Sequence, residues 1–119
     1  MKKIFEKWSD FVNETRQIKI WSTRIRVAIK RPEGATAVID DTLALIRAIP
    51  SITVVNSDTD QTATTINRAV VDVEFKFIPR STSVKSDLQE IKLEILRVSE
   101  LVIGVSPIRK MLSSLQRVQ

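Results

Sequence analysis

A strand, a helix and a second strand follow one another twice along this chain, and few folds accommodate that order. Strict alternation of apolar and polar side chains predicts the first strand of each half, and apolar residues at helical spacing predict each helix. The next strand is expected where short β-branched runs follow the helix. The expected order is strand, helix, strand, strand, helix and strand, at residues 18–30, 36–49, 52–56, 71–77, 84–98 and 101–105.

The two halves also resemble each other in sequence. The stretch LIRAIPSITVV in the first half corresponds to ILRVSELVIGV in the second. Because βαβ crossovers are right-handed, a doubled unit closes most simply as an antiparallel sheet of four strands with both helices on one face. This α+β, βαββαβ order resembles the ferredoxin-like α/β plait over residues 18–105. We therefore expect a ferredoxin-like domain at 15–105, flanked by amphipathic helices at 1–14 and 106–119.

The C-terminal helix is predicted from its start signal and its apolar stripe. Ser106 and Pro107 suit the cap and the first position of a helix. The stripe consists of Ile108, Met111, Leu112 and Leu115.

Composition excludes several chemistries. The 119 residues include no cysteine and no histidine, which removes disulfides, thiol nucleophiles, the commonest general base and the usual zinc ligands. The carboxylate pairs Asp40/Asp41 and Glu90/Glu94 stand apart from other reactive groups, and the second pair is typical of a solvated helix face. We expect no enzyme, no catalytic residue, no metal and no cofactor.

The alternating strands predict which side chains share a face of the sheet. Phe75 has the parity of its apolar neighbours, so we expect it against the helices rather than on an open face that stacks bases. Arg24 and Arg26 are expected to sit opposite Asp72 and Glu74 as cross-strand pairs, on a charged sheet surface or an oligomer face. Trp21 is predicted to pack, with the terminal helices covering that end of the sheet.

Two loops raise ligand hypotheses. In NSDTDQ, three side chains are spaced like the first ligands of a calcium loop, but Gln61 replaces the glycine and Asn67 the bidentate glutamate. A polar connection is the better interpretation. The Gly34 turn, with Arg31 beside it, lies where regulatory domains of the ACT type bind small molecules, although a plain turn explains one glycine equally well.

The N-terminal segment MKKIFEKWSDFVNE is predicted to be an amphipathic helix with an aromatic face. The residues expected to dock on a partner are Phe5, Trp8, Phe11 and Val12. Its three lysines are balanced by three acids, which favours contact with protein over a lipid surface, and no apolar run spans a bilayer. A lid over Trp21 and the sheet is the alternative.

The stretch WSDFVNE, after an MK start, resembles the capsid-targeting peptides of internal head proteins in large contractile-tailed bacteriophages. The resemblance implies that Trp8 and Phe11 are anchors and that a prohead protease recognises Val12 and Glu14. It also implies cleavage after Glu14, with Thr15 as the new terminus. Those internal proteins are small and basic, and the net charge here is +5, so the implied location is the host cytoplasm or the virion.

Two other functions stay open. One is a homo-oligomeric, ACT-like binding or interaction domain that uses Arg24, Arg26 and the Gly34 loop. The other is electrostatic binding of nucleic acid, because unopposed cations lie near both ends of the chain. They are Arg16, Lys19, Arg109, Lys110 and Arg117.

Overall fold

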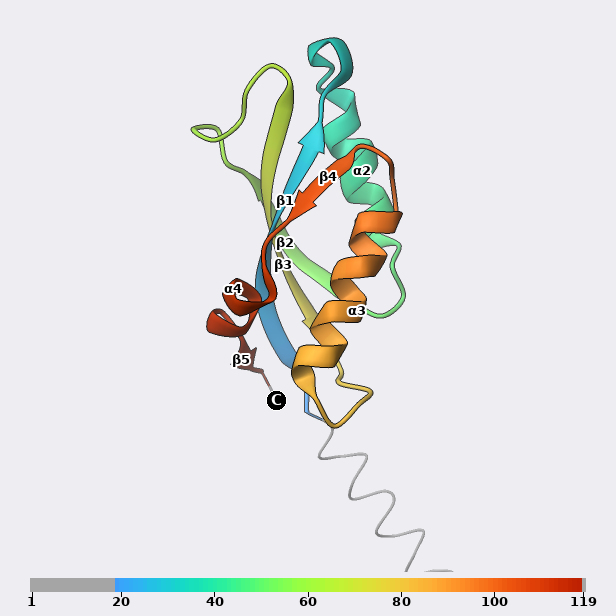
Figure 1. Ribbon diagram of the computed structural model, residues 1–119, viewed down its shortest axis with the longest axis vertical. Coiled ribbons are helices and arrows are strands. Elements are labelled where there is room, and N and C mark those ends of the chain that lie inside the picture. The colour runs from blue at the N-terminus through green and yellow to red at the C-terminus, as the bar shows by residue number, and fades with distance from the viewer. Residues whose placement is uncertain (1–18, 119) are drawn as a thin grey trace, which may run out of the picture.

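The computed structural model describes residues 19–118, and Figure 1 shows their arrangement. The elements are β1 (Trp21–Lys30), the short 3-10 helix η1 (Pro32–Gly34), α2 (Ala37–Arg47), β2 (Thr53–Thr59), β3 (Arg68–Phe77), α3 (Val84–Arg97), β4 (Val102–Val105), α4 (Ile108–Ser113) and β5 (Gln116–Arg117).

The four longer strands form an antiparallel sheet in the order β2-β3-β1-β4, with α2 and α3 over one face (Figure 1). The predicted α+β fold and the predicted order of strands and helices are confirmed. The structure adds η1 and a fifth strand, β5, which pairs with β1. It also lengthens β2 and β3, because β2 continues through Thr59 and β3 already begins at Arg68.

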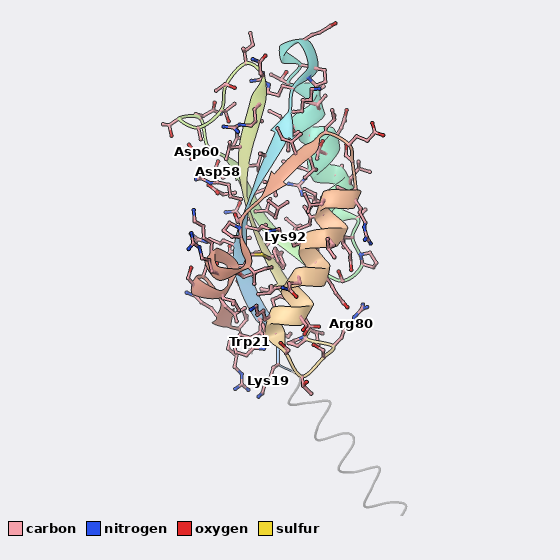
Figure 2. The ribbon with its side chains drawn as sticks, in the orientation of Figure 1. Lys19, Trp21, Asp58, Asp60, Arg80 and Lys92 are labelled. Carbon is pink, nitrogen blue, oxygen red and sulfur yellow. The ribbon has the colours of Figure 1, made fainter. Side chains whose placement is uncertain are left out.

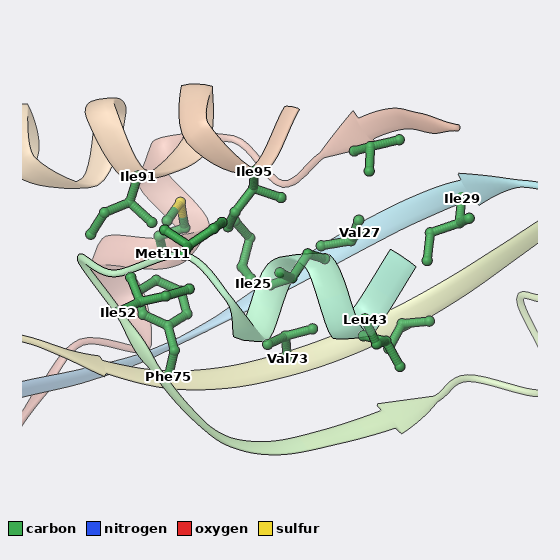
Figure 3. Close-up of a cluster of buried hydrophobic side chains, with 14 of the residues drawn as sticks. Ile25, Val27, Ile29, Leu43, Ile52, Val73, Phe75, Ile91, Ile95 and Met111 are labelled. Carbon is green, nitrogen blue, oxygen red and sulfur yellow. The ribbon is translucent and has the colours of Figure 1, made fainter. Parts of the chain in front are cut away.

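The core lies between the sheet and the two long helices (Figure 3). Alternate residues of β1 and β3 are almost completely buried, as their period predicted, and α2 and α3 contribute Ile46, Leu88 and Ile95. Phe75 and Phe77 are buried as expected, with ring centroids 5.9 Å apart. This burial is the main stabilising contribution and orients the opposite, charged face of the sheet.

The outer edge of β1 is completed by several short pieces. β4 pairs with β1 only at Val27–Ile29, and β5 pairs with it at Trp21 and Ser22. Between them, the backbone N–H of Arg26 donates to the Ser106 hydroxyl (2.7 Å) and that of Arg24 donates to the Ser114 hydroxyl (3.1 Å). Two serine side chains thus satisfy backbone groups that a longer β4 would have paired.

The predicted cap at Ser106 is wrong. Pro107 is the cap residue of α4 and makes no side-chain cap bond, while the Ser106 backbone N–H and hydroxyl both bond to the Arg26 carbonyl. The open edge of β1 competes successfully for this serine, because unpaired strand groups are costly.

The C-terminal segment belongs to the same core as the sheet. Met111 of α4 is fully buried among side chains of the sheet and α3, as Figure 3 shows, and Leu115 packs against the same cluster. The buried Thr23 hydroxyl donates to the Met111 carbonyl. Trp21 packs against the core as predicted, and β5 pairs with it. At the end of the sheet that terminal helices were expected to cover, α4 and β5 therefore cover the β1 side.

Candidate functional site

Several predicted site residues lie outside the described part of the chain. They are Phe5, Trp8, Phe11, Val12, the expected cleavage position Glu14, and Arg16. The structure places the other candidates on three surfaces, which are the open face of the sheet, the loops at one end and the end where β1 begins.

The open face carries the predicted cross-strand charge pairs. Arg24 lies opposite Glu74 and Arg26 opposite Asp72 in the β1–β3 register. Arg26 is held closely, because its Nε donates to one Asp72 oxygen (2.9 Å) and its Nη2 to the other (3.2 Å) and to Asp60 (2.8 Å). The Arg24 contact is looser at 4.0 Å. Bonding and charge from Asp72, with a smaller contribution from Asp60, raise the pKa of Arg26.

Asp60 closes the connection after β2. One of its carboxylate oxygens accepts from the Thr62 hydroxyl (2.7 Å) and from the backbone N–H groups of Thr62 and Ala63. These bonds, led by the Thr62 hydroxyl and assisted by Arg26, lower the pKa of Asp60. The carboxylate that the calcium spacing singled out is therefore engaged in a turn. Among residues 19–118, no cluster of three acidic side chains has metal-binding geometry.

The Gly34 loop, the site suggested by the ACT-type alternative, is held by Arg31. Its guanidinium donates to the carbonyls of Gly34 (3.0 Å), Ala35 (3.3 Å) and Thr65 (2.7 Å). Gly34 has φ +73°, and an added Cβ would lie 3.1 Å from the Ile66 side chain. Glycine is thus required by a turn that packs against the β2–β3 loop, and Arg31 joins two loops of the fold.

A groove that the sequence did not predict lies where β2 begins and β3 ends. It encloses about 430 Å³, and its apolar lining includes Ile20, Pro50, Ile52 and Phe77. Ile78 also lines it and is 52% exposed. These residues come from three distant segments, so no local pattern marks them as one surface.

An acidic stripe of α3 lies beside this groove. Asp87, Glu90 and Glu94 line a smaller hollow that shares Ile78 and Arg80 with the groove. The sequence pattern indicated that Glu94 is solvated. In the structure it accepts a hydrogen bond from the Ser51 hydroxyl at 2.8 Å. This bond ties α3 to the segment that leads into β2.

The strand pairing brings Lys19 and Arg117, which are cations from opposite ends of the chain, to one end of the sheet. Val118 donates its N–H to the Ile20 carbonyl (2.7 Å), which brings Lys19 to the end of the sheet where β5 lies. Figure 2 shows Lys19, Trp21 and Arg80 at this end of the molecule. Exposed cations of the C-terminal segment are Arg109, Lys110 and Arg117.

No helix among residues 19–118 has the length and hydrophobicity that a membrane crossing requires. No protein-family model and no curated protein matches the sequence. Among solved structures, the chain is similar to the C-terminal domain of the MgtC protein from Mycobacterium tuberculosis, at 10% identity and a TM-score of 0.46. The match covers 84% of this chain and 87% of that one. A likeness at this level carries no argument about function.

Proposed function

We propose that this protein is a non-enzymatic assembly protein of a contractile-tailed bacteriophage, built on a ferredoxin-like plait. It binds another protein through the aromatic face of its N-terminal segment. The anchors are Phe5, Trp8, Phe11 and Val12, which share one helical face in the sequence pattern.

One observation carries this proposal. The alternative role for the aromatic segment was to cover Trp21 and the adjoining end of the sheet. In the structure Trp21 already packs against the core and pairs with Arg117 of β5, and Met111 is buried in the same core. Three aromatic side chains within fourteen residues therefore have no required place in the domain's own core, and large apolar faces of this kind mark binding sites.

The destination of the segment follows from its resemblance to capsid-targeting peptides. WSDFVNE supplies the aromatic anchors and a glutamate at the expected cleavage position, Glu14. On this proposal the segment delivers a basic domain into the head, and the prohead protease then releases the domain with Thr15 as its first residue.

The test is incorporation into phage heads. We expect the double variant Trp8→Ala/Phe11→Ala to be depleted at least about tenfold from purified particles, the loss that corresponds to about 1.4 kcal/mol of binding. Asp10→Ala, on the opposite helical face, should be incorporated normally. The intact mass of the protein taken from particles should correspond to a chain that begins at Thr15. Equal incorporation of the double variant, or its unfolding in a thermal melt, would refute the proposal.

A second candidate function, binding of nucleic acid, is favoured by exposed cations of the C-terminal segment and by Lys19, which the strand pairing brings to the end of the sheet where β5 lies. The described members of this set are Lys19, Arg109, Lys110 and Arg117. Affinity for duplex DNA should then fall steeply with salt, and each contacting cation replaced by alanine should lower the slope of log K against log salt by about 1. Binding that is absent or insensitive to salt would exclude this function.

A further inference from the structure

The groove at the start of β2 is an apolar hollow that lies beside the entry of the N-terminal segment. Ile20, the residue before β1, is itself part of its lining. Ile52 and Phe77 form a buried floor, while Ile78 stays half exposed at the rim. An apolar groove with an exposed rim is suited to receive the apolar face of a helix.

The chain supplies an occupant within reach. Phe11 precedes Ile20 by only nine residues, which span at most about 30 Å when extended. A helix over 4–12 would be about 13 Å long. The tether also raises the effective concentration of the segment at the groove far above that of a free partner.

Both signs of charge surround the groove: Lys76 and Arg80 line the groove itself, and carboxylates of α3 line the hollow beside it. On a helical projection, Lys3 and Lys7 lie one turn apart, and Lys7 adjoins Phe11. The hollow next to the groove is lined by acidic residues of α3, including the exposed Glu90. An aromatic face seated in the groove can therefore place lysines near carboxylates.

We propose that the groove holds the aromatic face of the N-terminal segment of the same chain when no partner is bound. The regulatory consequence rests on the proposed function, because the same aromatic face then serves both the groove and the partner. The partner must displace the segment from the groove. The apparent affinity of the protein for its partner is therefore its intrinsic affinity multiplied by the fraction of molecules whose groove is empty. Because Ile78 at the rim is half exposed, the groove covers the segment only in part, which keeps this contact weak enough to exchange.

Disulfide trapping tests directly whether the segment occupies the groove, since the chain has no native cysteine. Phe11→Cys is combined in the full chain with Ile78→Cys inside the groove or with Val118→Cys outside it. Both partner positions lie close to Ile20 and are similarly exposed, at 52% and 46%, so a freely moving segment would reach either one. With oxidised glutathione we expect the Ile78 pair to form an intramolecular bond about tenfold faster, equivalent to about 1.4 kcal/mol of preference.

A second cysteine position in the segment tests which of its helical faces enters the groove. Asp10→Cys with Ile78→Cys should react slowly, because position 10 lies on the opposite face of the helical pattern. Equal rates at Ile78 and Val118 would overturn the inference. Disulfide-linked dimers would also overturn it, because they would assign the groove to the segment of a second copy.

Hydrogen exchange measures occupation of the groove without cysteines. Ile78→Asp should raise exchange of the amides of residues 4–12 about tenfold, whereas Val118→Asp should leave it unchanged. Exchange that is the same in wild type and Ile78→Asp would contradict occupation of the groove. The two proposals fail separately. If the segment occupies the groove but head incorporation does not depend on Trp8 and Phe11, only the proposed function is refuted. If incorporation depends on them but the segment does not occupy the groove, only this inference is refuted.

Discussion

The two edges of the sheet are built in opposite ways. On one edge, β2 runs for seven residues with an irregularity between Val54 and Asn56, and no further strand pairs with it among residues 19–118. On the other edge, the four residues of β4, the hydroxyls of Ser106 and Ser114, and the two residues of β5 share the outer side of β1.

This difference shows where the sequence repeat ends. The two halves begin alike, each with a long strand and a helix, but the second half closes with a much shorter strand. The C-terminal segment makes up the shortfall and buries Met111 in the core while doing so. We therefore expect substitutions on the β4–β5 side to be costly and substitutions on β2 to be mild.

The largest expected effect is at Met111. Met111→Ala removes a fully buried side chain and leaves a cavity, which should lower the free energy of unfolding by about 2–5 kcal/mol. Urea denaturation followed by circular dichroism measures the change. Leu112→Ala is the matched control, since this neighbour is 36% exposed and should cost much less. Equal costs would show that α4 does not contribute to the core.

The next effect is at Thr23, whose buried hydroxyl bonds to the Met111 carbonyl and to the Ser114 hydroxyl (2.8 Å). Thr23→Val keeps the shape but removes both bonds, while Ser114 still donates to the Met111 carbonyl, so the free energy of unfolding should fall by about 0.5–1.5 kcal/mol. Ser113→Ala, at an exposed position of α4, is the comparison and should change stability by less than about 0.5 kcal/mol. A neutral Thr23→Val would mean that the serine and threonine bonds do not hold this edge.

A smaller effect, dependent on pH, is expected at Asp60, which follows β2 and contacts Arg26 of the central strand. Its pKa is lower in the folded protein, so its ionised form stabilises the fold above the unfolded pKa, about 3.9. That contribution is lost as the pH falls below about 4, through the folded pKa. Asp60→Asn should flatten the loss of stability in this range, measured as melting temperature against pH. If the melting temperature of Asp60→Asn falls with pH as steeply as that of the wild type in this range, the assignment is contradicted.

The smallest effect is expected on the free edge. Val55 is 50% exposed in β2, and Val55→Thr keeps a β-branched side chain, so stability should change by less than about 0.5 kcal/mol in the same urea experiment. A loss comparable to that of Thr23→Val would indicate that this edge is covered in solution by a second copy, and light scattering would then show a dimer.

The sheet and its charge pairs were predictable because they follow from local periodicity. Alternation along β1 and β3 placed Phe75 in the core and put the two arginines of β1 opposite the two acids of β3, both of which the structure confirms. The register that sets Arg26 against Asp72 comes from the structure. The polar end of β2 was missed because an edge strand needs few apolar residues. β5 was missed because two polar residues carry no pattern and become a strand only by pairing with Trp21 and Ser22.

The candidate surfaces were less predictable than the fold. The aromatic face of the N-terminal segment is visible in the sequence because its spacing is local, and its docking residues stay a prediction. The groove was not visible, since Ile20, Ile52 and Ile78 become neighbours only when β2 and β3 are assembled. Arg31 seemed available for a ligand, but three backbone carbonyls take up its guanidinium, and such carbonyls leave no mark in sequence.

The piecewise edge of β1 also has a consequence for the order of folding. Arg24 and Ser114 are 90 residues apart, and Thr23 and Met111 are 88 apart. Contacts over such separations form late, because the chain must first close a long loop. Until they form, the first half of β1 offers unpaired backbone groups to other strands. A chain still emerging from the ribosome therefore carries this strand unfinished, and its risk of aggregation persists until the last helix and strand are made.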